Sequence, residues 1–295
     1  MQPPRSPKTK KKHLARAEAA YGFYPWQQKS WDARAAANFI FGGMGSGLIV
    51  FSVLSGVAGA RLAILLLAAL ALIGFGLFCV ALEIGRPLRA LNVFRNPRTS
   101  WMAREAWTAL TLVPATLAAA AGVPGCGWLA LALALVFVYC QSRMLLAAKG
   151  IPAWREPLVR PLIIVTGMAE GGGMLLVANW QIGVAASLVI LFAASVIIRW
   201  LILIAYRRRM KAALAAGAAA ALDRAGRVLL LAGTLLPVLL VAVTAVPGVA
   251  TAPLQALAGV AAAAAGAYFK YTLVMHAGFN QGFALPQFPV RGARV

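Results

Sequence analysis

The chain alternates between long apolar runs and short polar connections. Each of eight runs has about the 20 residues that a helix needs to cross a bilayer core roughly 30 Å thick. These runs lie near residues 35–58, 62–83, 106–121, 128–148, 159–178, 182–205, 228–247 and 252–275, and the third is the shortest. Backbone N–H and C=O groups in hydrocarbon must be satisfied within the segment, so the runs predict helices and not barrel strands. The pattern therefore predicts an all-α integral membrane protein with eight transmembrane helices.

Two local patterns add detail to this prediction. The run Gly42-Gly43-Met44-Gly45-Ser46-Gly47 lacks the signature of a phosphate-binding loop, and small residues at this spacing predict close packing of two helices. The Ala-rich stretch Ala212 to Ala221 predicts a short cytoplasmic helix between the sixth and seventh spans.

The composition agrees with a membrane protein. Of 295 residues, 62% are hydrophobic and 12% are charged, and the mean hydropathy is +0.81. Such a charged share is about half that of a typical soluble domain. The three cysteines lie far apart, and of the two histidines, His13 and His276, only His276 lies near a helix end. We therefore expect no iron–sulfur cluster and no bis-histidine haem in this chain.

The positive charge lies almost entirely on one side of the predicted membrane. The chain has 28 Lys and Arg against 7 Asp and Glu, and our assignment puts 27 of the 28 on one side, Arg199 and Lys270 included, and only Arg61 on the other. The positive-inside rule then predicts cytoplasmic termini in an inner membrane protein. This distribution indicates attraction to anionic lipid, not to nucleic acid. The expected parts are a basic cytoplasmic tail (1–33), the membrane domain (34–276) and a cytoplasmic C-terminal tail (277–295).

The seven acidic residues are few enough to weigh one by one. Four of them fall in predicted tails or loops, where solvation explains them: Glu18, Asp32, Glu156 and Asp223. Glu83 ends the second run and Glu105 begins the third. Glu170 lies about ten residues inside the fifth, where an ionisable side chain costs roughly 2.5–3.5 kcal/mol. Two interpretations of Glu170 stay open, a proton relay and a neutral hydrogen-bonded packing role.

The connection after the second run carries the most specific motif. It reads Glu-Ile-Gly-Arg-Pro-Leu-Arg-Ala over 83–90 and Asn-Pro-Arg-Thr-Ser-Trp-Met-Ala-Arg-Glu-Ala-Trp over 96–107. These stretches resemble the membrane anchor subunits of dimethyl sulfoxide reductase and of polysulfide and nitrite reductases. That family has a His-Leu-Gly-x-Pro turn and a Ser-Trp-Leu-Ser-Arg-Glu start of the third helix. The variant with Gly-Arg-Pro and Ser-Trp-Met resembles anchors of phenylacetyl-CoA:acceptor oxidoreductase complexes.

The resemblance implies a quinone-reactive anchor, with menaquinone or ubiquinone as the quinone. Its partners would be a four-cluster ferredoxin-like iron–sulfur subunit and a molybdopterin or tungstopterin catalytic subunit, so this chain would not act on the organic substrate itself. The quinone-site His and Glu of the family correspond to Glu83 and Glu105. Glu83 departs from the pattern, because a carboxylate does not donate a hydrogen bond as a neutral imidazole does.

The residues by themselves favour the same region. Quinone reduction takes two electrons and two protons, so the site needs hydrogen-bond donors, a proton carrier and an apolar slot for the ring. Arg86 and Arg104 are donors, Glu105 is a proton carrier, and Trp101 offers a flat apolar surface. Arginine and tryptophan are also ordinary anchors at a membrane surface. His276, near the end of the last run, is a second candidate donor or simply a helix cap.

Two other functions remain open at this point. An ion-coupled secondary transporter also fits eight helices and a carboxylate at mid-membrane depth, although the halves show no convincing inverted repeat. A structural anchor without a quinone site is the other alternative.

Overall fold

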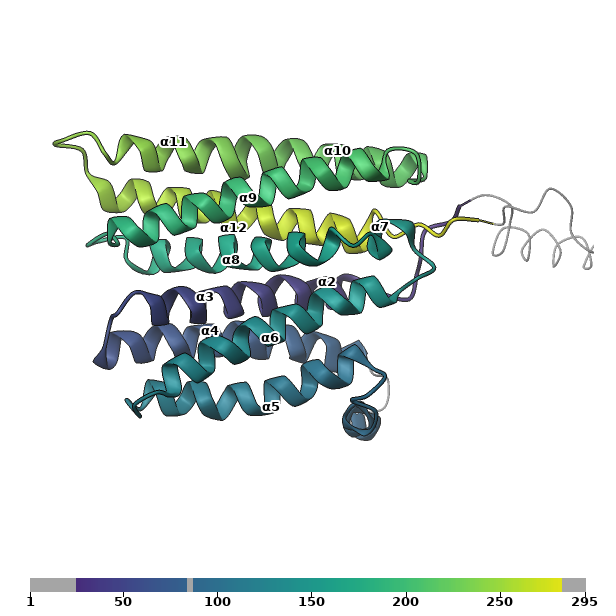
Figure 1. Ribbon diagram of the computed structural model, residues 1–295, viewed down its shortest axis with the longest axis horizontal. Helices are drawn as coiled ribbons and strands as arrows, with labels where there is room; N and C mark the ends of the chain where they lie inside the picture. The colour runs from purple at the N-terminus through teal and green to yellow at the C-terminus, as the bar shows by residue number, and fades with distance from the viewer. Residues whose placement is uncertain (1–24, 84–86, 283–295) are drawn as a thin grey trace, which may run out of the picture.

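The structure is a computed structural model that describes residues 25–83 and 87–282, with side chains described outside 84–90 (Figure 1). Long helices run side by side along the molecule, and the described residues contain no strand beyond one isolated bridge between Gln27 and Phe279. Within these described residues, seven helices are long and apolar enough to cross a membrane. The prediction of an all-helical, multi-pass membrane protein is therefore confirmed for the described residues.

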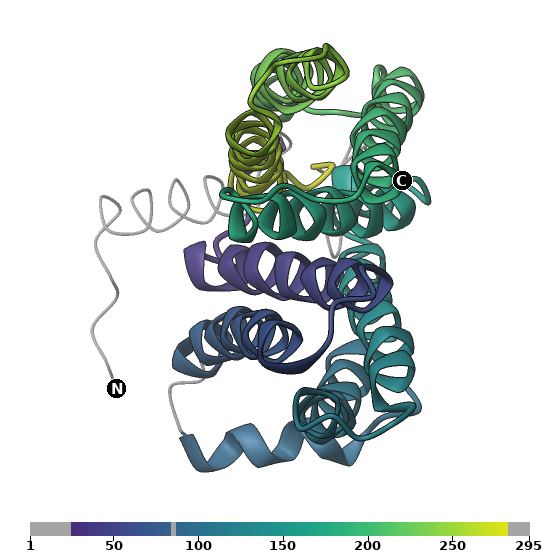
Figure 2. The same cartoon turned by 90° about the vertical axis from the view of Figure 1, so that its left-hand side faces the viewer.

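The helices form two groups of four. The first group is α2–η1–α3 (Ala33–Ala37, Asn38–Gly42 and Gly43–Leu54), α4 (Gly59–Glu83), α5 (Trp101–Ala120) and α6 (Cys126–Ala147). The second is α8 (Val159–Ala178), α9 (Ala186–Met210), α10–η3–α11 (Ala216–Leu230, Leu231–Leu235 and Leu236–Val243) and α12 (Thr251–Met275). Figure 2 shows the first group, purple to teal, below the second, teal to yellow.

Two short elements connect the helices at one end of the molecule. The 3-10 helix η2 (Pro87–Arg95) runs across this end between α4 and α5, and α7 (Pro152–Arg155) lies between α6 and α8 (Figure 1). The segment before α2 lies beside the segment after α12, because the Gln28 N–H donates to the Gly278 carbonyl at 2.7 Å. Both ends of the described chain therefore leave from the same end of the bundle.

The seventh helix differs from the prediction. The Ala-rich stretch is not a separate short helix, because α10 begins at Ala216 and continues through η3 and α11 to Val243 as one 28-residue span. Alanine is the strongest helix former, and nothing between Ala216 and Leu230 interrupts the helix. The predicted start of this span was therefore wrong by about three turns, and Asp223 lies within a helix instead of a loop.

The third helix begins earlier than predicted. The Ser100 side chain accepts a hydrogen bond from the Ala103 N–H, so α5 starts at Trp101 and Glu105 lies in its second turn. α5 is 20 residues long and packs against α6, but it is not among the seven helices apolar enough to span by composition. Its polar first turns leave a shorter apolar stretch than in the other long helices.

Glycines hold the two groups together. Gly43 and Gly47 on α3 face Gly167 and Gly171 on α8, and the backbones come so close that a Cβ on Gly171 would overlap backbone atoms of Gly47. α8 packs against α12 in the same way, where Gly173 meets a glycine of α12. Close packing by the glycine run of the first helix, as predicted, is confirmed.

The glycine contact predicts a large effect of one methyl group. Gly171→Ala should lower the melting temperature of the purified protein in detergent, because overpacking a tight contact costs about 1–3 kcal/mol or more. Gly74→Ala on α4 is the matched control, since nothing lies within 4 Å of a Cβ at that position. Equal melting temperatures for the two variants would contradict the close approach of α3 and α8.

Candidate functional site

Glu83 and Glu105 come together at the end of the first helix group. They line one small cavity, which we call the Glu105 cavity, with a volume of about 30 Å³. Its other lining residues come from four helices and the segment before α2: Trp31, Ala35, Asn38, Phe39, Val80, Met102 and Met144. This space holds about one water molecule. Two of the three acids singled out by the sequence therefore face the same space.

The Glu105 carboxyl group is buried and held by an amide. Only 3% of Glu105 is exposed, and the Asn38 Nδ2 donates to Glu105 Oε1 at 3.1 Å. Gln141 Nε2 donates in turn to the backbone carbonyl of Asn38 at 2.9 Å. The side-chain oxygens of Asn38 and Gln141 are buried without a partner in the described structure. These acceptors suit an O–H donor, from a protonated carboxyl group or from a bound hydroxyl.

Arg34 positions the chain around Glu83. Its guanidinium donates to the Leu82 carbonyl at 2.7 Å and pairs with Asp32 at 2.7 Å. Asp32 also caps α2 by accepting from the Arg34 N–H. The hydrogen bonds from Arg34 hold the pKa of Asp32 below its usual value, so this acid stays ionised. Glu83, half-buried at the last residue of α4, is thereby fixed at the mouth of the cavity.

Arg104 and Trp101 lie outside the Glu105 cavity. Arg104 donates to the carbonyls of Pro97 and Arg98 at 2.7 Å each and stacks over the Trp101 ring at 4.0 Å. Arg143 lies 4.5 Å from the same ring centroid. Two cations on one tryptophan hold the loop before α5 against α6. These contacts agree with the alternative role of Arg104 and Trp101, in which they anchor the helix at the membrane surface instead of binding quinone.

His276 also lies apart from the cavity, and Arg86 falls outside the described residues. His276 follows α12 as its C-terminal cap residue, is exposed, and meets the Tyr271 ring edge-on at 5.6 Å. Nearby, the Asn280 side chain accepts from the Trp26 N–H at 2.9 Å. This polar end of α12 therefore holds the segment before α2 in place.

Glu170 belongs to a second, fully enclosed cluster. Lys270 Nζ lies 2.6 Å from Glu170 Oε2, and neither side chain has any exposed surface. The same Nζ donates to the Phe39 carbonyl at 2.8 Å. The charge assignment from the sequence put Lys270 on the cytoplasmic side, and this was wrong. Lys270 lies more than a turn inside α12, facing Glu170 on α8, so the acid is paired with a cation.

Arg199 is the third member of this cluster, and its cytoplasmic assignment was also wrong. α9 runs unbroken from Ala186 to Met210, which places Arg199 in its middle with no exposed surface. Its two Nη atoms donate to the carbonyls of Gly233 at 2.6 Å and Ala262 at 3.1 Å. Gly266 separates Arg199 from Glu170, since a Cβ there would approach both side chains within about 3 Å. We call Glu170, Lys270 and Arg199 the buried charge cluster.

The two π-helical turns of the described chain serve this cluster. A π turn breaks the regular i to i−4 hydrogen-bonding ladder, which leaves carbonyl groups available to other donors. Phe39 lies in η1 and its carbonyl accepts from Lys270, while Gly233 lies in η3 and its carbonyl accepts from Arg199. Each cation thus obtains one backbone acceptor from a π turn, and Arg199 obtains a second from Ala262 in the regular helix α12.

One turn of the first helix connects both sites. Asn38 and Phe39 are consecutive residues of η1: the first holds Glu105 by its side chain, and the second holds Lys270 by its carbonyl. A change of protonation or hydrogen bonding at Glu105 therefore acts on a backbone segment that also holds the buried charge cluster.

No known protein-family model matches this chain, and no curated protein matches its sequence.

Sequence reasoning missed four residues of these sites: Asn38, Gln141, Arg199 and Lys270. The last two carried a signal, because a cation well inside a long apolar run is as costly as the Glu170 that was recognised. Because both cations were assigned to the cytoplasmic side, the free-energy cost of burying them inside the membrane was not considered. Asn38 and Gln141 carried no such signal, since an amide near a helix end is common on a membrane surface.

Removing the buried salt bridge should lower the free energy of unfolding much more than removing an exposed one. Lys270→Met should destabilise the protein by about 3–5 kcal/mol, because it leaves the Glu170 carboxylate buried without its cation. Arg209→Gln removes a pair with Glu156 at 3.3 Å, in which the Arg209 side chain is 62% exposed, and should cost about 0–1 kcal/mol. Unfolding in detergent measures both. Recovery of stability in the double variant Glu170→Gln with Lys270→Met would show that the pair is the cause, and equal losses in the two single variants would refute it.

Proposed function

We propose that this chain is the quinone-reactive membrane anchor of a molybdenum or tungsten pterin oxidoreductase complex. The observation that carries the proposal is the meeting of Glu83 and Glu105 in one cavity at the charged end of the bundle. These residues occupy the positions of the quinone-site His and Glu in the anchor family that the 83–107 stretch resembles. A buried carboxyl group beside a second, half-buried one supplies a proton carrier and a route for protons from water.

The residues of the Glu105 cavity fit the chemistry of a quinone headgroup. Asn38 offers an amide donor and an unpartnered acceptor oxygen, Glu105 offers an exchangeable proton, and Trp31 and Phe39 offer apolar surface. The cavity has room for about one water molecule, so the ring enters only if a side chain moves aside. Met102 and Met144 line it, and methionine side chains adapt readily because they are unbranched.

The proposed arrangement has eight spans with cytoplasmic termini. In this arrangement α5 is the third span, packed beside α6. The partners would be a ferredoxin-like iron–sulfur subunit and a molybdopterin or tungstopterin catalytic subunit on the cytoplasmic face. The support is the charge distribution, since the end with η2 and α7 carries most of the described cations, whereas Arg61 at the other end hydrogen-bonds to Asn179 at 2.8 Å.

The role of Glu105 predicts a loss of quinone chemistry without a loss of assembly. Glu105→Gln keeps the hydrogen-bonding shape but removes the exchangeable proton, so quinone-coupled turnover of the purified complex should fall by about 10²-fold or more. Glu156→Gln, an acid at the same end of the bundle, should leave turnover unchanged. Normal turnover in an assembled Glu105→Gln complex would exclude the role assigned to Glu105. If the native protein shows no saturable quinone binding, a structural anchor without a quinone site is the remaining interpretation.

The topology gives an independent prediction. A reporter that is active only in the cytoplasm should be active when it is fused after Val295, because the positively charged connections stay on the cytoplasmic side of the membrane. A fusion within the loop between α5 and α6, at Val123, should report the opposite side. A periplasmic signal from the Val295 fusion would overturn the side assignment and the cytoplasmic partners with it.

An ion-coupled secondary transporter is the second candidate, and the buried charge cluster is the observation that favours it. Glu170 and Lys270 lie where α8 packs between α3 and α12, at the junction of the two helix groups. Buried ionisable groups in such a place often belong to ion pathways. Ion flux through liposomes containing only this chain, abolished by Glu170→Gln, would favour transport over the anchor function.

A further inference from the structure

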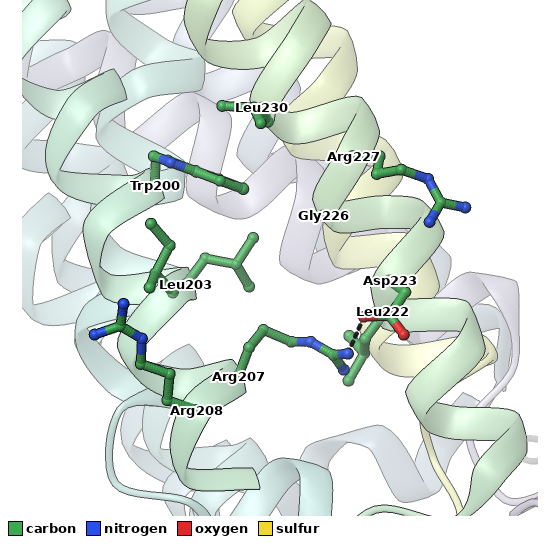
Figure 3. Close-up of a pocket in the computed structure, with 10 residues that line it drawn as sticks. Trp200, Leu203, Arg207, Arg208, Leu222, Asp223, Gly226, Arg227 and Leu230 are labelled. Atoms are coloured by element: carbon green, nitrogen blue, oxygen red, sulfur yellow. Dashed lines mark hydrogen bonds and ion pairs between the residues drawn. The ribbon is translucent and has the colours of Figure 1, made fainter. Parts of the chain in front are cut away.

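A groove between α9 and α10 carries chemistry that the proposed function does not use. The α9–α10 groove has a volume of about 310 Å³. Ten residues line it, five from each helix: Trp200, Leu203, Ile204, Arg207, Arg208, Leu222, Asp223, Gly226, Arg227 and Leu230 (Figure 3). It lies at the end of α9 that carries three consecutive arginines, which is the end where both described chain termini leave.

A missing side chain keeps the groove open. Gly226 lies in the wall formed by α10, and a Cβ at this position would meet only Leu203, at 3.8 Å. Figure 3 shows Trp200 and Leu230 at one end of the space and Arg207, Arg208 and Asp223 toward the other, with Arg227 on the α10 side. The groove is therefore apolar at its inner end and polar at its outer end, over about 10 Å from Trp200 to Arg207, which are two helical turns apart.

The polar end is positively charged. Arg207 reaches across the space toward α10 and pairs with Asp223, while the guanidinium groups of Arg208 and Arg227 point outward on either side (Figure 3). Asp223 uses one guanidinium nitrogen of Arg207, and Nη1 has no partner in the described structure. No ion pair holds Arg208 or Arg227 within the described residues, so three cations face one acid here.

The apolar end is partly open to the surroundings of the bundle, because Trp200 and Leu230 are half-buried. Leu201 and Leu231, next to two lining residues, are 57% and 60% exposed. In a membrane protein such exposed leucines of long apolar helices contact acyl chains. A molecule that fills this groove therefore has an anionic group at the membrane surface and a hydrocarbon tail beside it.

We propose that the α9–α10 groove binds an anionic phospholipid. Its phosphate lies at Arg207, Arg208 and Arg227 add positive charge on either side, and one acyl chain follows Leu203, Trp200 and Leu230 inward. Basic pockets between membrane helices on the cytoplasmic side are suited to such headgroups. Arginine donates two parallel hydrogen bonds to a phosphate, which makes the contact stronger than that of a single donor. A soluble phosphate compound would use only the outer end of the groove.

Native mass spectrometry of the delipidated full-length protein tests this site. With phosphatidylglycerol added, we expect one lipid per chain bound above the unspecific background, and clearly less binding of phosphatidylcholine. The double variant Arg207→Gln with Arg227→Gln should weaken phosphatidylglycerol binding by roughly 25-fold, since each cation near an anionic surface contributes a factor of about five. Arg224→Gln is the matched control, because this exposed arginine on α10 does not line the groove.

A second pair of variants separates the groove from its charges. Gly226→Phe fills the space and leaves every cation in place, so it should abolish the specific lipid, whereas Gly226→Ala should keep it. The arginine variants decide the question if Gly226→Phe fails to fold. The proposal is overturned by equal binding of phosphatidylcholine, by an equal loss in Arg224→Gln, or by displacement of the lipid with millimolar inorganic phosphate, which would indicate a soluble phosphate ligand.

Discussion

A lysine, a glutamate and an arginine lie together in the middle of the bundle, with no surface in contact with the surroundings. Removing such charges from water is expensive, and their mutual attraction offsets the cost only when the geometry is good and the remaining hydrogen-bonding groups are satisfied. Glu170 on α8 and Lys270 on α12 lie 2.6 Å apart, and Lys270 also binds the first helix. The positions of three helices thus depend on this pair.

The backbone is adapted to these charges at two places. Most inner carbonyl groups of a regular helix already accept a backbone hydrogen bond, so they offer few free acceptors to a buried cation, although Arg199 does use one of them, the Ala262 carbonyl of α12. The Phe39 carbonyl in the π turn η1 accepts a hydrogen bond from Lys270, and the Gly233 carbonyl in the π turn η3 accepts one from Arg199. π turns often occur at functional sites, and η1 also carries Asn38, which holds Glu105. The Glu105 cavity and the buried charge cluster are thus joined through neighbouring residues of one backbone turn.

Much of the fold follows from the sequence because the bilayer leaves few choices. Apolar runs of about 20 residues must be helices, and the glycine run of the first helix must meet another helix closely. Element ends were less certain. The single glycine of the Ala-rich stretch, Gly217, did not break the helix among so many alanines, so the helix continued into the span, and the Ser100 cap extended α5 by a turn beyond its apolar run.

The sequence by itself determined the class of the protein and the acids worth attention, because hydropathy and the scarcity of acidic residues are properties of the chain. Only the tertiary structure decided which of these residues meet. Glu83 and Glu105 lie on different helices and share a cavity, whereas Arg104 and Trp101 stack elsewhere. Lys270 and Arg199 are charges inside apolar runs, and their partners lie 100 and 34 residues away along the chain. Contacts over such separations depend on how helices pack, which a pattern along one helix does not contain.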